Sequence, residues 1–175
     1  MDVKPVIVGV DGSPDSVRAL QWAAEHARLI EAPLHGVISW EVATIYGDTF
    51  FGKQDFTAVE EKNREVLEGA VRKALGEGAQ VEARIERGNA SEVLVRASRD
   101  AQLVVVGSRG HGGFTGMLLG SVSQHLVTHA RCPVLVMPHG RPSKASKPAK
   151  SSKTTKTATA KTAKTAKTAR AAKKK

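Results

Sequence analysis

A glycine-rich segment in the second half of the chain has the residue types of a phosphate site. The stretch "VVVGSRGHGGFTGMLLGSVSQHL" begins at Val104 and holds six glycines between an apolar run and a helix-like pattern. Glycine has no Cβ, so a ligand can approach the backbone N–H groups of such a loop. Successive N–H groups bind anions, and the start of a helix adds unpaired N–H groups and the positive end of its dipole. The alternative is a flexible surface loop.

The segment differs from two familiar phosphate-binding loops. It contains no Gly-Lys-Ser/Thr, so it is not a Walker A loop and has no lysine to reach a γ-phosphate. The dinucleotide fingerprint belongs after the first strand, where this sequence has "VDGSPDS" with a single glycine. The anion site is therefore expected at the later segment.

The elements that position this segment alternate along the chain. Strands are predicted at 5–11, 34–40, 80–87, 102–107 and 132–138, and helices at 15–32, 56–75, 89–101 and 120–131. Strict alternation predicts right-handed crossovers and a parallel sheet with helices on both faces. The first and fourth strands are uninterrupted apolar runs and belong at the centre, whereas the third alternates as an edge strand does. We expect a five-stranded, Rossmann-like α/β fold of order 3-2-1-4-5.

The predicted order has a switch point between the first and fourth strands. Ligands of such sheets bind at the carboxyl ends of the strands that flank the switch. Asp11 follows the first strand and Gly107 ends the fourth, so both are expected at one edge of the sheet.

The glycine spacing resembles that of a known family. Gly107, Gly110 and Gly120-Ser121 reproduce the G-x2-G-x9-G-[ST] signature of the universal stress protein family. The stretches "VGVDGSPDSVRALQWA", "GNASEVLVRAS" and "CPVLVMP" are also similar to segments of that family, and the similarity spans 4–138. The resemblance implies the fold argued above and a homodimer. It also implies that the protein belongs to the subgroup of the family that binds ATP.

The resemblance also implies roles for individual residues. The phosphates would lie against the glycine segment and the helix that follows it, at Gly107, Gly110, Gly120, Ser121, Val122 and Ser123. Asp11 would face the ribose or a bound metal ion such as Mg²⁺; the alternative is a turn-forming Asx residue that caps the first helix. A residue near Ser39 or Trp40 would line the adenine, and Trp40 is otherwise a core residue.

Several weaker candidates lie nearby. Arg109 and His111 are cations within the glycine segment, where they either meet phosphate oxygens or point to solvent. Gly88 and Asn89 form the corresponding loop after the third strand. The stretch "TIYGDTFFGKQDF" holds four of the seven aromatic residues and is either a lid over the nucleotide or a hydrophobic flap on the sheet or a partner.

The charge of the chain is concentrated at its C-terminal end. Residues 141–175 contain 13 Lys or Arg and no acid, whereas residues 1–140 contain 14 basic and 17 acidic side chains, a net of −3. We therefore expect a nucleotide-binding domain over 1–140 and a disordered Lys/Ala/Thr-rich tail over 141–175, similar in composition to H1-type linker histone tails. Such a tail would bind DNA or RNA without sequence preference, or serve only as a solubilising appendage.

Composition also bounds the location of the protein. The chain has one cysteine, no recognisable signal peptide and no apolar run of the roughly 18 residues that a membrane span requires. These features indicate a cytoplasmic protein, with nucleoid association if the tail binds DNA.

The expected function is that of an ATP-binding regulatory protein of the stress response. The sequence shows no nucleophile, base and orienting residue in a recognisable set, so we do not expect an enzyme. One alternative is a slow ATP-hydrolysing or phosphotransfer enzyme. A second is a nucleoid-associated DNA-binding protein in which the fold is only a dimeric scaffold.

Overall fold

Five parallel strands form one sheet in the order β3-β2-β1-β4-β5, as the sequence predicts. A computed structural model of the chain describes residues 3–41, 56–110 and 118–140. The strands are β1 (Val6–Gly9), β2 (Leu34–Trp40), β3 (Glu82–Arg87), β4 (Leu103–Gly107) and β5 (Val134–Met137), and the helices are α1 (Pro14–Leu29), α2 (Thr57–Leu75), α3 (Ala90–Ala97) and α4 (Ser121–His129). The tail and the aromatic stretch that precedes Phe56 lie outside the described residues.

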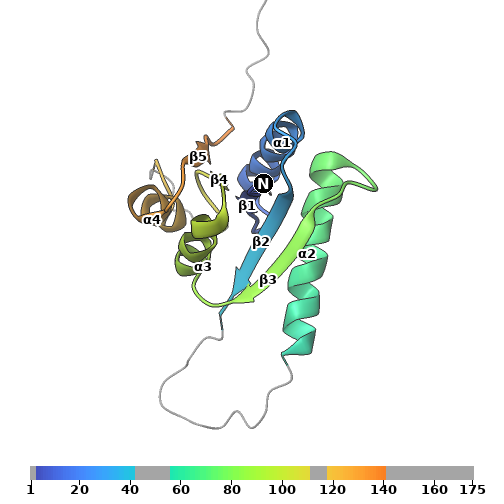
Figure 1. Cartoon of the computed structure of the whole chain (residues 1–175). Coiled ribbons are helices and arrows are strands. Elements are labelled where there is room, and N and C mark those ends of the chain that lie inside the picture. The colour runs from blue at the N-terminus through green and yellow to red at the C-terminus, as the bar shows by residue number, and fades with distance from the viewer. Residues whose placement is uncertain (1–2, 42–55, 111–117, 141–175) are drawn as a thin grey trace, which may run out of the picture. The chain divides into compact units, whose positions relative to one another are not determined.

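The sheet separates two hydrophobic cores. Figure 1 shows α1 and α2 on one side of the sheet and α3 and α4 on the other. Side chains of a strand alternate between faces, so Val6 and Val8 pack toward α1 and α2, whereas Ile7 packs toward α3 and α4. Burial on both faces explains why β1 and β4 are continuous apolar runs.

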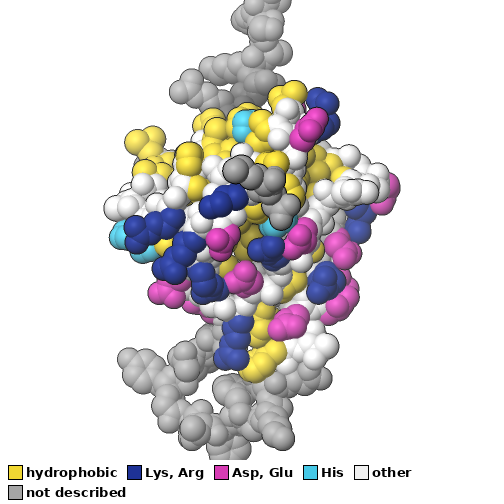
Figure 2. All heavy atoms as spheres, in the orientation of Figure 1, with side chains coloured by type: hydrophobic (Ala, Val, Ile, Leu, Met, Phe, Trp, Pro, Cys, Tyr) yellow, Lys and Arg dark blue, Asp and Glu magenta, His cyan; other side chains and the backbone are white. Residues whose placement is uncertain are grey.

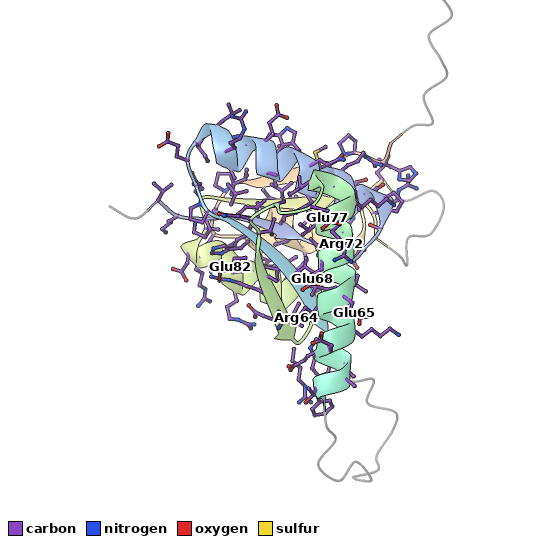
Figure 3. The ribbon with its side chains drawn as sticks, turned by 90° about the vertical axis from the view of Figure 1, so that its right-hand side faces the viewer. Arg64, Glu65, Glu68, Arg72, Glu77 and Glu82 are labelled. Atoms are coloured by element: carbon purple, nitrogen blue, oxygen red, sulfur yellow. The ribbon has the colours of Figure 1, made fainter. Side chains whose placement is uncertain are left out.

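The edge strand β3 and the helix beside it carry charges of both signs. Figure 3 shows these side chains at Arg64, Glu65, Glu68, Arg72, Glu77 and Glu82. Within α2, Arg64 forms an ion pair with Glu61 at 3.8 Å, and Arg72 forms one with Glu68 at 3.9 Å. Exposed pairs of this kind contribute less than about 1 kcal/mol each. Figure 2 shows basic and acidic side chains mixed in the same way over the face it presents.

None of the described helices is long and apolar enough to cross a bilayer.

Candidate functional site

A cavity of about 690 Å³ opens at the carboxyl ends of the central strands. Its walls come from the ends of β1, β2 and β4 and from four helices, with the lining residues Gly9, Val10, Asp11, Ser16, Val37, Ile38, Ser39, Asn63, Val66, Ala90, Leu94, Val106, Gly107, Arg109, Gly110, Gly120, Ser121, Val122 and Ser123. This is the switch point where the strand order reverses. The volume falls within the roughly 300–1,000 Å³ typical of small-molecule sites. A second hollow, between α2 and β3, has only about 200 Å³.

The turn between β1 and α1 fixes Asp11 at the mouth of the cavity. Asp11 Oδ1 accepts a hydrogen bond from the backbone N–H of Ser13 at 2.9 Å, which is an Asx turn. Ser13 then caps α1 by accepting from the N–H of Ser16 at 3.2 Å. Gly12 between them has φ 82°, a conformation that favours glycine. Asp11 therefore forms the predicted turn while its other oxygen lies beside Gly110, where a Cβ would meet it.

The two ends of the glycine-rich segment are joined at Ser108. The N–H of Gly120 donates to the carbonyl of Ser108 at 2.7 Å, and the N–H of Ser108 donates to the carbonyl of Met137 at 2.7 Å. The hydroxyl of Ser123 donates to the carbonyl of Gly107 at 2.8 Å. These bonds hold the start of α4 against the end of β4, and residues 111–117 of the segment between them lie outside the described residues. The predicted contact of His111 lies there as well.

The first turn of α4 faces the cavity without a side-chain cap. Ser13 caps α1 and Asn89 caps α3 with a side-chain oxygen, whereas the cap residue of α4 is Gly120, which has none. Ser121, Val122 and Ser123 all line the cavity. The N–H groups that begin a helix have no partner within it and carry a partial positive charge. The start of α4 is therefore suited to an anion.

Gly120 has room for a side chain within the protein itself. A Cβ at this position would lie 3.4 Å from the carbonyl oxygen of Ser108, which is ordinary contact. The φ of Gly120 is −73°, which any residue adopts. Among the described residues, neither packing nor backbone conformation requires glycine at this position, which leaves room beside the start of α4.

A buried carboxylate lies beneath the glycine-rich segment. The Asp15 side chain is 3% exposed and is held by Arg18 Nη2 at 2.6 Å and by His139 Nδ1 at 3.0 Å. Burial is the largest influence and would raise the pKa of Asp15, but the hydrogen bonds and charges of His139 and Arg18 together outweigh it. The pKa of Asp15 therefore lies below its ordinary value of 3.8, and this carboxylate is ionised at neutral pH.

Most of the residues predicted from the sequence line the cavity together. They are Asp11, Gly107, Arg109, Gly110, Gly120, Ser121, Val122 and Ser123. Trp40 is outside the lining: it is 8% exposed and packs against Phe56 and Arg87, with ring centroids 5.3 Å apart for the aromatic pair. Its neighbour Ser39 does line the cavity, together with Val37 and Ile38 of the same strand.

The sequence did not predict the walls that α2 and α3 contribute. Asn63 and Val66 on α2 and Ala90 and Leu94 on α3 line the cavity. Ala90 directly follows Gly88 and Asn89, the loop that the sequence offers as a weaker candidate, so its place near the site was predictable. The place of Asn63 and Val66 was not, because α2 has few buried positions to show which of its sides faces the sheet.

Of the lining residues that the structure describes, Asp11 alone is acidic, and the sequence predicts that it holds a metal ion. Among the described residues, no group of three or more His, Cys, Asp or Glu side chains is placed to bind a metal ion. Mg²⁺ at nucleotide sites is commonly bound through one or two carboxylates together with the phosphates of the ligand. The chemistry of Asp11 fits that mode of binding.

The sheet order, the switch-point cavity and the uncapped helix start define a doubly wound α/β protein with an anion-accommodating site. The chain belongs to the universal stress protein family, whose model matches residues 2–138. A universal stress protein of Mycobacterium tuberculosis strain H37Rv is 37% identical over 135 residues, covering 77% of this chain and 48% of the relative. The chain therefore spans about half the length of the curated relatives it matches.

Two solved relatives were determined with adenine nucleotides. A universal stress protein from Archaeoglobus fulgidus in complex with dAMP is 25% identical, with a TM-score of 0.53, and covers 78% of this chain and 99% of that one. A universal stress protein in complex with cAMP is 27% identical, with a TM-score of 0.50, and covers 78% of this chain and 98% of that one.

Proposed function

We propose that this chain is a regulatory stress protein that binds an adenine nucleotide, ATP, in the switch-point cavity. The observation that carries the proposal is the start of α4, where Gly120 leaves the first N–H groups uncapped and leaves room beside them. That arrangement is suited to phosphate. The relatives solved with cAMP and dAMP support an adenine nucleotide, and the G-x2-G-x9-G-[ST] spacing supports ATP.

The polar and apolar parts of the cavity suit the two ends of a nucleotide. Arg109, Gly110 and the start of α4 form a wall that is rich in N–H groups and carries one cation, which favours the phosphates. The apolar part of the lining, with Ile38 and Val66 among its residues, favours the base. Asp11, beside Gly110, would face the ribose or bind Mg²⁺ together with the phosphates.

Identification of the bound molecule is the first test. The protein is purified without added nucleotide, denatured and analysed by mass spectrometry. Calorimetric titrations with ATP, AMP, cyclic AMP and GTP then rank the ligands, and we expect ATP to bind most tightly and GTP to bind weakly. Equal affinity for GTP would exclude adenine recognition, and failure of all four to bind would refute the proposal.

A matched pair of substitutions tests the position of the phosphates. Gly120→Ala places a methyl group beside the start of α4, so we expect a loss of ATP affinity of about tenfold or more with little loss of stability. Gly69→Ala is the control: Gly69 lies on α2, nothing lies within 4 Å of its Cβ position, and it is not part of the cavity. Unchanged affinity in Gly120→Ala would place the phosphates elsewhere.

A regulatory role and an enzymatic one differ in turnover. An enzyme would hydrolyse or transfer phosphate well above background, and Asp11→Asn or Ser121→Ala would abolish that turnover. We expect binding without such turnover, since the described lining holds one carboxylate, Asp11, and no histidine, lysine or cysteine to act as a second catalytic group.

Homodimer formation through β5 is part of the proposal. β5 is an edge strand, and its sequence "VLVM" is apolar and only partly buried. An open apolar edge is an aggregation hazard unless another strand or chain covers it. The family resemblance supports a second copy as the partner.

A second proposed activity is sequence-independent binding of DNA or RNA by the tail. The supporting observation is the run of 13 cations without an acid over 141–175. The domain, in contrast, balances its cations with acids: residues 1–140 hold 14 basic and 17 acidic side chains, and some of them pair, such as Arg96 with Glu86 at 2.6 Å between α3 and β3. This contrast favours the tail as the nucleic-acid contact, and with it the division into a domain over 1–140 and a tail over 141–175.

A further inference from the structure

Three parts of the chain that are far apart in sequence meet at the Asp15 carboxylate. Asp15 lies in the first turn of α1, Ser108 follows β4, and His139 follows β5. The carboxylate accepts from the Ser108 hydroxyl at 3.3 Å and contacts His139 Nδ1 at 3.0 Å. Arg18 completes the group: it bonds Asp15 at 2.6 Å and the carbonyl of Pro138 at 3.1 Å.

Ser108 connects this group to the candidate nucleotide site. It is 4% exposed, and its backbone carbonyl accepts the N–H of Gly120, the residue that begins the uncapped turn of α4. Its own N–H is bonded to Met137. All three polar groups of Ser108 are thus engaged, and the Asp15 carboxylate fixes the side chain. A shift of Ser108 would move the start of α4 with it.

Asp15 itself does not line the cavity. It packs against the other side of Gly107, where a Cβ would lie 2.8 Å from the Cβ of Asp15. The charged and titratable groups that contact the carboxylate are Arg18 from α1 and His139 from the segment after β5, and Ser108, which follows β4, is neutral. A buried carboxylate with three donors has one well-defined position.

We propose that Asp15 is a positioning residue for the nucleotide site, which acts through Ser108 on Gly120 and is itself held by Arg18 and His139. The proposal rests on the function proposed above. It implies that the segment after β5 takes part in nucleotide binding although it does not touch the cavity. Removing the carboxylate or His139 lowers ATP affinity because the phosphate-binding turn is no longer held in one place.

The experiment compares four variants of the full chain under conditions in which each is folded. Asp15→Asn and His139→Ala are the test variants. Asp100→Asn, an exposed carboxylate beyond α3, and His26→Ala, near the end of α1, are the matched controls. We expect ATP affinity to fall about tenfold in Asp15→Asn and severalfold in His139→Ala, within the range of ordinary coupling between sites. Neither control changes it.

Two readouts separate positioning from general destabilisation. Amide exchange in the free protein should accelerate at Gly120 in Asp15→Asn, beyond any change in the central strands, and this readout needs no ligand. Ser108→Ala supplies a double-mutant cycle: if Asp15 acts through Ser108, the effect of Asp15→Asn on affinity shrinks in the Ser108→Ala background.

The possible outcomes distinguish this proposal from the one on which it rests. If the natural chain binds no nucleotide, the proposed function fails, and amide exchange at Gly120 still decides whether Asp15 holds the turn. If the natural chain binds ATP and Asp15→Asn binds it equally well, Asp15 has no positioning role. Additive effects of Asp15→Asn and Ser108→Ala would likewise overturn the route through Ser108. If Asp15→Asn does not fold, His139→Ala, whose side chain is 53% exposed, carries the same test.

Discussion

A Cβ atom placed on Gly107 would lie 2.8 Å from the Cβ of Asp15 and 3.0 Å from its backbone carbonyl carbon. Glycine at the end of β4 therefore permits α1 to pack closely against the strand. The carbonyl carbon belongs to the backbone and cannot move aside as a flexible side chain can. The first glycine of the signature thus has a packing role in addition to any contact with a ligand.

The first prediction follows from that contact. Gly107→Ala should lower the free energy of unfolding by about 1–3 kcal/mol, the usual cost of overpacking a close contact. Gly69→Ala, in the interior of α2 with open space around it, should instead be neutral or stabilising by up to about 1 kcal/mol. Urea denaturation of both variants measures the difference. Equal stability of the two variants would show that α1 can shift away from Gly107 at little cost in free energy.

The second prediction concerns Gly110. Among the described residues, its Cβ would meet Oδ2 and Cγ of Asp11, which belong to an exposed side chain and can move aside at less cost than backbone atoms. Gly110→Val should change stability by less than about 1 kcal/mol, because surface substitutions seldom cost more. It should lower ATP affinity more than tenfold, because it displaces Asp11 and fills the path of the phosphates.

Calorimetry and denaturation of the same Gly110→Val sample separate these two effects. Gly69→Val on α2 serves as the binding control, since Gly69 is outside the cavity. Affinity equal to that of the natural chain would remove the segment around Gly110 from the site.

The sheet order was predictable because burial on both faces leaves a clear mark on a sequence. β1 and β4 have no polar residue facing solvent, so their apolar runs identify them as central strands. The glycine-rich segment was equally visible, since its glycines follow a buried strand and precede a helix. The position of Asp11 at the same edge of the sheet was predictable as well, because Asp11 follows the other central strand, and its role toward a ligand stays a prediction.

Other parts of the site depend on contacts that no local pattern encodes. The Asp15 and His139 side chains meet across 124 positions of sequence. Only two residues of α2, Leu67 and Ala70, are buried, so its pattern did not reveal which side faces the cavity. For the base, the choice between Ser39 and Trp40 depended on how far along β2 the cavity extends and on the contacts of Trp40 with Phe56 and Arg87.

The third prediction concerns acid stability. The pKa of Asp15 is lower in the folded protein than its ordinary value of 3.8, so the ionised carboxylate stabilises the fold above that pH. This contribution is lost as the pH falls below 3.8 toward the folded pKa. Asp15→Asn should therefore be less stable than the natural chain at pH 5, by about 1–3 kcal/mol.

Denaturant titrations at a series of pH values between 5 and 3 test this sign. The stability gap between Asp15→Asn and the natural chain should narrow as the pH falls below 3.8. A gap that widens toward pH 3 would mean that the carboxylate is stabilised in its protonated form, contrary to its contacts with Arg18 and His139.

The fourth prediction concerns the outer edge of β5. The carbonyls of Pro133 and Met137 accept hydrogen bonds from β4, so by alternation the N–H of Val136 points away from the sheet. Val136→Pro removes this outward donor, and proline is tolerated on an edge strand. It should convert the dimer to a monomer without loss of folding.

Light scattering at micromolar protein concentration checks this prediction. Leu135→Pro is the comparison, because its N–H faces β4 and its loss should destabilise the fold itself. A monomeric mass for the natural chain would refute the dimer, and a Val136→Pro variant that remains dimeric would place the interface elsewhere.

The fifth prediction concerns residues 141–175, which hold 13 of the 27 basic residues of the chain. The full chain should bind duplex DNA without sequence preference, and the affinity should fall steeply with salt. Each phosphate contact releases condensed counterions, so the logarithm of the binding constant changes by about −0.9 per contact with the logarithm of salt concentration. A chain that ends at Gly140 should lose this binding and keep its affinity for ATP, since Asp11, the start of α4 and His139 are all retained. Fluorescence anisotropy of both chains across a salt series measures the slope. Equal DNA affinity of the two chains, or affinity of the full chain that is insensitive to salt, would leave the tail as a solubilising appendage.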